Sequence, residues 1–241
     1  MNGRMKQLLA PVAEKLERAV PVYSKVGDSV FFTNDQFPWS STLEANWKVI
    51  REELDAVMVN VDDLPNFHDI SPRQMKIAGD NLWKTYFFWA FGFKAKANCD
   101  RCPETVKILQ KIPGLKVAFF SILAPGKHIP EHRGKHKGLI RYHLGLKVPE
   151  NKEACRIRVA DQFAHWQEGK SLIFDDTFYH EVWNDTDEYR VVLFLDIVRP
   201  LRFPMSLVNW LVNTLVAVSP IVQVARRNQS NWEKHFEEIL K

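Results

Sequence analysis

The stretch EHRGKHKGLIRYHLGLKVP, residues 131–149, combines side chains that bind metal ions with side chains that bind anions. It starts beside His132 and continues into an alternating apolar segment that carries Arg141 and His143. Residues two apart in a β-strand project from the same face, so these last two side chains are expected to lie together. A buried guanidinium is costly without a partner, and a carboxylate supplies one through two parallel hydrogen bonds. The stretch therefore predicts a carboxylate-binding site.

A second pair of candidates follows later in the chain. His180 begins one strand-like segment and Arg190 stands at the start of the next. Neutral histidine is a common ligand of iron, zinc and copper, so His132 and His180 would form a metal site if the fold brings them together. A metal beside a cationic clamp for a dicarboxylate is what a 2-oxoglutarate oxygenase requires. The keto acid chelates iron at one end, and its far carboxylate needs a buried cation.

The elements that must position these residues are short strands. From about residue 117, segments of high β-propensity follow one another between Pro, Gly and Asn/Asp clusters. They span residues 117–123, 139–148, 155–160, 171–176, 180–184 and 189–198. Residues 124–134, which contain His132, are interpreted as a loop. Because no helix-length segment interrupts the series, we expect a jelly roll with flanking helices, a mainly β fold.

The first part of the chain reads as helical and irregular. Apolar residues at helical spacing predict an N-terminal amphipathic helix through Leu8, Leu9, Val12, Leu16 and Val20. Further helices are expected over residues 41–54 and 103–112, and an aromatic strand over 81–93. For the helix over 41–54, the capping-box pattern predicts Ser41 or Thr42 as N-cap with Glu44 as its acid.

The organisation that we expect is one structural unit in three parts. Residues 1–115 would pack on a catalytic core of residues 116–200, and residues 201–241 would form an apolar helical extension. Residues 203–225 contain no charged residue and carry a narrow polar stripe of Ser206, Asn209 and Asn213. Such a helix packs on its own core, lies on a membrane surface or forms a dimer interface. The pattern leaves these three alternatives open.

Composition excludes several classes of protein. A net charge of +4 from 33 basic and 29 acidic residues is too small and too evenly spread to indicate nucleic-acid binding. Cys99 and Cys102 form a lone CxxC without a second ligand pair, so we interpret them as ordinary cysteines in a reducing compartment. The N-terminus lacks the apolar core of a signal peptide. We expect a cytoplasmic protein, or one at the inner face of the membrane.

The chemistry-bearing residues fall in one order along the chain: Ser121…His132-Arg-Gly134…Arg141-Tyr-His143-Leu-Gly-Leu…Phe174-Asp-Asp…His180-Glu-Val-Trp-Asn…Arg190. This pattern resembles the aspartyl/asparaginyl β-hydroxylase family, whose members are Fe(II)/2-oxoglutarate oxygenases built on a double-stranded β-helix, a jelly-roll variant. The likeness covers roughly residues 80–200. It implies iron, 2-oxoglutarate and O2 as cofactor and cosubstrates.

The resemblance also implies a role for each matching residue. His132 and His180 would be the iron ligands, and Arg190 would hold the far carboxylate of 2-oxoglutarate. Ser121, Arg141 and His143 would help to bind the cosubstrate through hydrogen bonds.

Residues close to these positions are not expected to bind the metal. Gly134 stands where many oxygenases of this chemistry have a carboxylate ligand, so a water would complete the iron's shell. His128 and His136 are interpreted as solvated loop histidines. Asp175 and Asp176 are interpreted as turn or outer-shell groups rather than ligands.

Several substrates remain open at this stage. The family resemblance favours hydroxylation at the β-carbon of an Asp or Asn residue or related amino acid. Residues 37–54 and 196–211 are similar to bacterial lipid A hydroxylases, which favours an acyl chain at the membrane. Gly134 also permits an iron-dependent halogenase, and a cupin-like binding protein without metal is the non-enzyme alternative. The partner is therefore a small-molecule, peptide or lipid substrate, with membrane contact or dimerisation through residues 203–225 and no nucleic acid.

Overall fold

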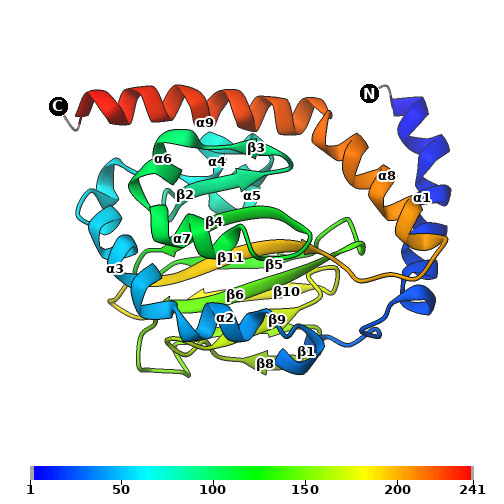
Figure 1. Ribbon diagram of the computed structural model, residues 1–241, viewed down its shortest axis with the longest axis horizontal. Coiled ribbons are helices and arrows are strands. Elements are labelled where there is room, and N and C mark those ends of the chain that lie inside the picture. Colours follow the sequence, from blue (N-terminus) through cyan, green and yellow to red (C-terminus); the bar gives the residue numbers. More distant parts are fainter. Residues whose placement is uncertain (1–2, 240–241) are drawn as a thin grey trace.

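Two antiparallel β-sheets face each other in the computed structural model, which describes residues 3–239 except for the side chains of residues 3–10, 12 and 13 (Figure 1). The large sheet consists, in spatial order, of β1 (Phe31–Phe32), β9 (Ser171–Phe174), β6 (Leu139–Lys147), β11 (Arg190–Val198), β4 (Leu115–Leu123), β2 (Trp83–Ala90) and β3 (Phe93–Lys94). The small sheet consists of β5 (His128–His132), β10 (His180–Asn184), β7 (Cys155–Val159) and β8 (Gln162–Ala164).

From β4 onward the chain passes back and forth between the two sheets. β4, β6, β9 and β11 lie in the large sheet, whereas β5, β7, β8 and β10 lie in the small one. This winding is a double-stranded β-helix, so the predicted fold class is confirmed. All six strands expected after residue 117 are present.

The expectation of a loop over residues 124–134 is wrong, because residues 128–132 form β5. Pro130 and the flanking Gly and Pro residues hide this strand in the sequence. β5 is an edge strand of the small sheet and pairs only with β10 within the described chain, a position that tolerates proline.

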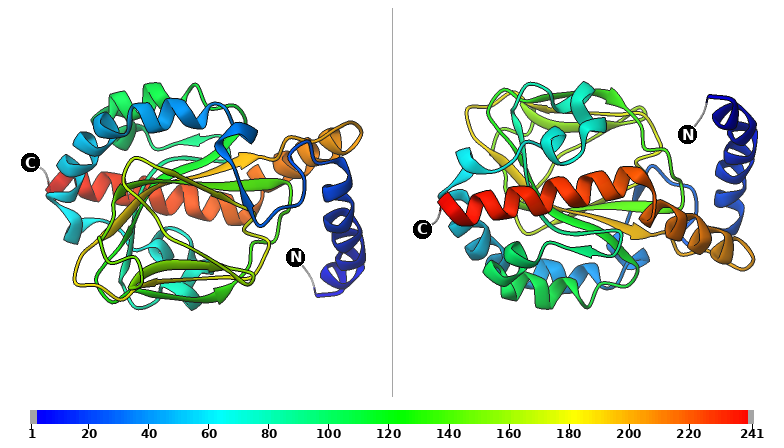
Figure 2. Two further views of the ribbon diagram at one scale, coloured as in Figure 1. Left: turned by 90° about the horizontal axis from the view of Figure 1, so that it is seen from below. Right: turned by 90° about the horizontal axis from the view of Figure 1, so that it is seen from above.

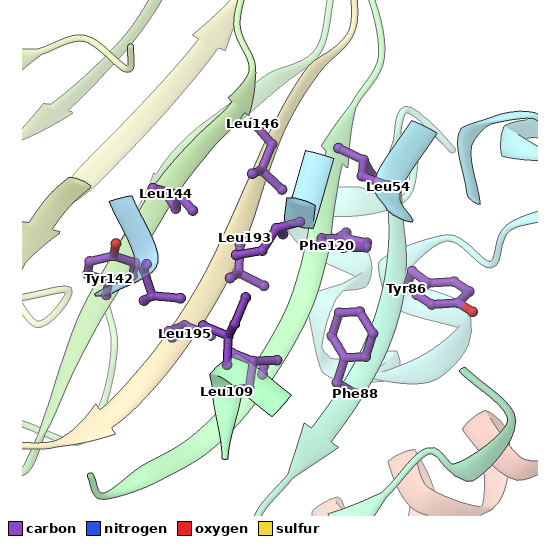
Figure 3. Close-up of a cluster of buried hydrophobic side chains, with 14 of the residues drawn as sticks. Leu54, Tyr86, Phe88, Leu109, Phe120, Tyr142, Leu144, Leu146, Leu193 and Leu195 are labelled. Atoms are coloured by element: carbon purple, nitrogen blue, oxygen red, sulfur yellow. The ribbon is translucent and has the colours of Figure 1, made fainter. Parts of the chain in front are cut away.

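The outer face of the large sheet is covered by helices. α3 (Trp47–Met58), α6 (Lys96–Arg101) and α7 (Pro103–Leu109) pack on alternate residues of β2, β4, β6 and β11. Figure 3 shows part of this cluster, which includes Leu54 of α3, Leu109 of α7 and Phe120, Leu144 and Leu193 of the strands. Because side chains alternate along a strand, the residues between these project into the space between the sheets.

The remaining helices surround the two sheets. They are α1 (Gly3–Tyr23), α2 (Ser40–Ala45), α4 (Phe67–Ile70), α5 (Met75–Ala78), α8 (Met205–Ala217) and α9 (Pro220–Ile239), with short 3₁₀ turns at Asn34–Gln36, Val61–Asp63 and Pro72–Gln74. α9 runs along one side of the molecule above α4 and the β2 edge, and α8 and α1 stand together at one end (Figures 1 and 2). β1, β2 and β3, from the first hundred residues, belong to the same large sheet as the later strands.

The expected helix over residues 41–54 is two helices that meet at Asn46. The predicted capping box is wrong, since α2 begins at Ser40. Glu44 instead accepts hydrogen bonds from the side chain of Asn34 (2.9 Å) and from the backbone N–H of Ser171 (2.8 Å). A long-range contact therefore replaces the local cap, which sequence spacing alone does not reveal.

The other early predictions agree with the structure. α1, α7 and β2 occupy the segments where helices and an aromatic strand are expected. Leu16 and Val20 of α1 pack near Leu201 and Met205, whereas the side chains of Leu8, Leu9 and Val12 lie outside the described residues. The three cysteines are free and buried, and burial raises the pKa of Cys99 and of Cys102 to about 12.

Candidate metal and cosubstrate site

His132 and His180 meet at one end of the small sheet. His132 is the last residue of β5 and His180 the first of β10, and the two are directly paired across the strands. Their ring centroids are 4.2 Å apart. Neighbouring antiparallel strands thus bring together two imidazoles that are 48 positions apart in the sequence.

Backbone contacts orient both imidazoles in the same way. The Nδ1–H of His132 donates to the carbonyl of Pro130 at 2.8 Å, and that of His180 donates to the carbonyl of Phe178 at 2.9 Å. A carbonyl can only accept, so each neutral ring presents an unprotonated Nε2, the form that binds a metal. Burial lowers the pKa of both rings, to about 3 for His180, which keeps them neutral.

Arg190, the first residue of β11, is buried. It is only 2% exposed, and its Nε and Nη1 have no hydrogen-bond partner among residues 3–239. Its guanidinium lies 4.4 Å from the ring centroid of Trp166, and burial lowers its pKa to about 10, so it remains charged at neutral pH. A buried cation with unpaired donors calls for an anionic partner, and a carboxylate matches its fork.

His143 and Ser121 project into the same space between the sheets as Arg190. His143 faces Phe194 across β6 and β11, and Ser121 faces Val192 across β4 and β11. His143 accepts a hydrogen bond at Nδ1 from Trp166 Nε1 (3.2 Å), so its Nε2 carries the hydrogen, and that atom has no partner in the described chain.

Ser121 accepts a hydrogen bond from Trp83 Nε1 at 3.0 Å, which leaves its own O–H to donate. Arg190, His143 and Ser121 therefore offer hydrogens to an anion from the same inner face of the large sheet.

Arg141 lies on the metal side and is already paired. Its guanidinium forms ion pairs with Asp176 (2.9 Å) and Asp196 (3.1 Å) and lies 4.4 Å from the ring centroid of Phe194. Arg141 and His143 do share one face of β6, as their spacing indicates. The cosubstrate role of Arg141 stays a prediction, and the structure adds a second role, holding Asp176.

Gly134 lies directly against Asp176. The backbone N–H of Gly134 donates to the carbonyl of Asp176 at 2.7 Å, and a Cβ added to Gly134 would collide with the Asp176 carboxylate. Burial raises the pKa of Asp176 to about 6, although Arg141 opposes this shift. A carboxylate from another strand connection thus fills the place of a side chain at position 134. Among residues 3–239, no group of three or more His, Cys, Asp and Glu residues has metal-site geometry.

The neighbouring loop histidines differ from each other. His128 is exposed as expected, with its Nε2 2.8 Å from Glu181 and its ring stacked on Trp183. The expectation of a solvated His136 is wrong, because Asn209 of α8 packs against it and burial lowers its pKa. Asp175 is fully buried and forms ion pairs with Lys137 and Arg199, which makes it a structural residue.

A cleft of about 700 Å³ leads away from His132 and Gly134. It extends under α5 and α9, and its walls are mainly aromatic and aliphatic, including Phe67, Phe87, Phe91, Phe93, Val117, Phe119, Leu139, Phe194, Ile221, Val222 and Ala225. Cationic side chains also line it, namely Arg73, Lys76, Arg133, Lys135 and Arg226. The site is therefore open to an elongated apolar group that ends in an anionic or polar one.

Two residues of the site escape sequence reasoning. Trp166 supports both Arg190 and His143, and Asp196 pairs with Arg141. Trp166 lies outside the strands, so no periodicity marks it. Asp196 is the one charged residue in β11 after its first residue, Arg190, and that exception is a usable signal.

Comparison with known proteins places the chain in context. A family model described as aspartyl/asparaginyl β-hydroxylase matches residues 44–200 and so includes every candidate site residue. The ornithine lipid ester-linked acyl 2-hydroxylase of Rhizobium tropici is 46% identical over 214 residues, which cover 89% of this chain and 76% of that protein. The human aspartyl/asparaginyl β-hydroxylase is 38% identical over 170 residues, 68% of this chain but 22% of the human protein.

Among solved structures, a cupin domain of a transcriptional regulator from Enterobacter cloacae covers 49% of this chain and 99% of its own, at 13% identity and a TM-score of 0.34. The assignment to a family consequently comes from the sequence matches, which span most of the chain. On that basis this chain belongs to the aspartyl/asparaginyl β-hydroxylase family and is a hydroxylase.

Proposed function

We propose that the protein is an Fe(II)/2-oxoglutarate-dependent dioxygenase that hydroxylates an unactivated carbon. The observation that carries this proposal is the buried guanidinium of Arg190, with two nitrogens unpartnered among residues 3–239, together with the two adjacent metal-ready imidazoles of His132 and His180. Nε2 of His132 and of His180 would hold the iron, and Arg190 would hold the far carboxylate of 2-oxoglutarate. The bound iron, with 2-oxoglutarate and O2, supplies the oxidising power that converts a C–H bond into C–OH.

The chain's own residues orient the cosubstrate. His143 Nε2–H and the Ser121 hydroxyl would donate to its carboxylate beside Arg190. The ring of Phe174 lies between the imidazoles of His143 and His180, with its centroid 5.2 Å from that of His143 and 5.9 Å from that of His180. This aromatic spacer keeps the region between metal and guanidinium apolar, which strengthens the ion pair that Arg190 would form.

The substrate class that the cleft supports best is the acyl chain of a polar lipid. Aromatic and aliphatic walls extend from His132 to α9, a lining that suits methylene groups, and the cations at the same cleft suit an anionic head group. The Rhizobium tropici relative is named for hydroxylating such an acyl chain. The lipid alternative of the sequence interpretation therefore gains support from the shape and lining of the cleft.

The β-carbon of an Asp or Asn residue is the second candidate, and the cations of the cleft also favour it. Lys135 follows Gly134 and would receive a substrate carboxylate close to the metal position, whereas Arg133 on the other side of Gly134 is already paired with Glu17. The family description names aspartyl and asparaginyl residues. Both candidates involve the same site residues and differ in what occupies the apolar cleft.

Hydroxylation is favoured over halogenation by Asp176. A halide would need the space that the missing side chain at Gly134 leaves beside the metal. The Asp176 carboxylate fills that space and, when ionised, repels an anion. We therefore expect a product heavier by one oxygen atom even at high chloride concentration.

The test is an incubation of the iron-loaded protein with 2-oxoglutarate, O2 and three substrates: a polar lipid with ester-linked acyl chains, an Asp-containing peptide and free aspartate. Each mixture would be analysed by mass spectrometry. We expect one added oxygen in the acyl chain of the lipid, with succinate released in equal amount. Oxygen in the peptide alone would favour the second candidate. No oxidised product and no 2-oxoglutarate binding would refute the proposed function.

Matched variants locate the metal in the same experiment. His132→Ala and His180→Ala should each abolish product and iron binding, because each removes half of the protein ligands. His128→Ala changes an exposed histidine of the same strand and should retain most of the activity. Equal losses in His128→Ala and His132→Ala would contradict the choice of ligands.

A further inference from the structure

Helix α8 has its two asparagines on the inside. Asn209 and Asn213 are buried, 3% exposed each. Asn209 Nδ2 donates to the carbonyl of Gly138 at 2.9 Å, and Asn213 Nδ2 donates to Asn209 Oδ1 at 3.0 Å. Of the stripe seen in the sequence, Asn209 and Asn213 form the face by which α8 attaches to the protein, joined by Met205 against α1, whereas Ser206 is exposed.

The opposite face of α8 is apolar and exposed. This face consists of five residues that are between 52% and 67% exposed: Leu207, Trp210, Leu211, Leu215 and, just after the helix, Val218. Thr214 lies on the same face, but its hydroxyl donates to the carbonyl of Trp210 at 2.9 Å within the helix. A helix at a water-exposed surface normally shows the reverse arrangement, so this face calls for an apolar environment.

The surroundings of this face indicate which environment that is. Exposed arginines stand on both sides, Arg202 before α8 and Arg226 and Arg227 after it, with no acidic residue between them. Figure 2 shows α8 and α1 at one end of the molecule, away from the two sheets. Apolar side chains bounded by cations, with a Trp among them, match the interface of a membrane that contains anionic lipids.

The same face is continuous with the cleft of the candidate site. Ile221, just after the α8–α9 junction, is 41% exposed and also lines the cleft. Val222, the next residue, and Ala225, one turn further along α9, also line it. The two helices are bent by 50° relative to each other at this junction. Within residues 3–239 no single helix is long and apolar enough to span a membrane, whereas α8 and α9 together meet those criteria.

We propose that the apolar face of α8 docks in the interface of a bilayer containing anionic lipids, with the helix lying along the membrane surface. An acyl chain then passes from the bilayer over Ile221 into the cleft, a step that rests on the proposed function. A second copy of the chain fits this face less well. Two α8 helices packed antiparallel would bring Arg202 of each copy close to Arg226 and Arg227 of the other, which places like charges together.

Vesicle binding tests the docking without any turnover. The metal-free full chain would be sedimented with phosphatidylcholine vesicles, with and without phosphatidylglycerol. We expect binding to the vesicles that contain phosphatidylglycerol and weaker binding as the salt concentration rises. The double variant Leu211→Glu/Leu215→Glu should bind at least about tenfold less, because it removes apolar side chains and adds two anions.

Val59→Glu is the matched control, since Val59 is an exposed apolar residue at the end of α3, far from α8 in the chain. It should bind vesicles like the native chain, and thermal unfolding should show that both variants fold. Equal binding of the double variant and the native chain would overturn the proposal. So would a native dimer without vesicle affinity that the double variant converts to a monomer.

Activity on two forms of lipid separates this proposal from the function on which it partly rests. The double variant should hydroxylate detergent-dispersed lipid like the native chain but lose activity on lipid in vesicles. If the native chain hydroxylates dispersed lipid but does not bind vesicles, docking is refuted and the proposed function stands. If it binds vesicles and hydroxylates neither form, the docking stands and the lipid substrate is refuted.

Discussion

Two arginines at the two ends of β11 are almost completely buried, and their surroundings are opposite. Arg199, just after the strand, is 0% exposed and donates to the carbonyls of Lys137 (2.8 Å) and Gly27 (3.0 Å) and to the Asp175 carboxylate. Arg190, the first residue of the strand, is 2% exposed with Nε and Nη1 unpartnered among residues 3–239. One guanidinium is satisfied by the chain, and the other awaits a partner from outside.

The difference shows how to separate a structural charge from a binding charge. The Arg199 network connects the segment after α1, the start of β6 and the turn after β9, so it fastens parts of the fold. Arg190 instead lies over the ring of Trp166, an apolar neighbour that increases the attraction for an anion and provides none itself. Folding alone gains nothing from such an unpaired cation.

Removing Arg199 should have the largest effect, and the effect should be on stability. Arg199→Ala leaves Asp175 buried with Lys137 as its remaining cationic partner, and breaking a buried pair of this kind costs about 3–5 kcal/mol. Urea unfolding measures the loss. Arg202→Ala is the control, since that arginine is exposed, and its effect should stay within about 0.5 kcal/mol. Similar losses in both variants would mean that the network contributes little.

Arg190→Ala should reduce ligand affinity without reducing stability. Affinity for 2-oxoglutarate should fall by about 2–5 kcal/mol, because a buried charge-assisted contact is lost. The free energy of unfolding without ligand should stay the same or rise, since an unpaired buried charge disappears. Calorimetric titration of metal-loaded protein under nitrogen measures the affinity. A destabilised variant with unchanged affinity would make Arg190 a structural residue like Arg199 and would remove the contrast.

Arg190→Lys sharpens the comparison, because it keeps the charge and removes the fork. A lysine presents one ammonium group instead of a planar pair of donors, so we expect a loss of about 1.5–3 kcal/mol in 2-oxoglutarate affinity. The same titration measures it, with Arg158→Lys on the exposed side of β7 as the control. An affinity equal to that of the native chain would show that charge alone binds the cosubstrate.

Trp166→Phe should give the smallest change. A phenyl ring still lies under Arg190, but the hydrogen bond from Trp166 Nε1 to His143 Nδ1 is lost. That bond no longer fixes the His143 imidazole in the tautomer that carries its hydrogen on Nε2. We expect about 0.5–1.5 kcal/mol weaker 2-oxoglutarate binding. A loss as large as that of Arg190→Ala would assign the main support of the carboxylate to the tryptophan.

Much of the architecture could be predicted from local patterns. Alternation along residues 139–147 places Arg141 and His143 on one face of β6, and the strand starts at His180 and Arg190 are as the turn signals indicate. The ordered motif from Ser121 to Arg190 identifies the family. These features depend on residues close in sequence or on their order, which a single chain displays directly.

Other features depend on residues that are distant in the sequence. The ion pairs of Arg141, the support of Arg190 by Trp166 and the carboxylate of Asp176 against Gly134 all join separate strands and loops. β5 escapes prediction because its pairing with β10, rather than its composition, makes it a strand.

The orientation of α8 is the clearest case. An amphipathic pattern determines that a helix has two unlike faces, and the sequence alone establishes the Asn209 and Asn213 stripe. Only the tertiary structure decides which face is inside, because that depends on the backbone carbonyl of Gly138, to which Asn209 donates. A polar stripe goes inward where the fold offers it a hydrogen-bond partner, and the apolar face is then left outside.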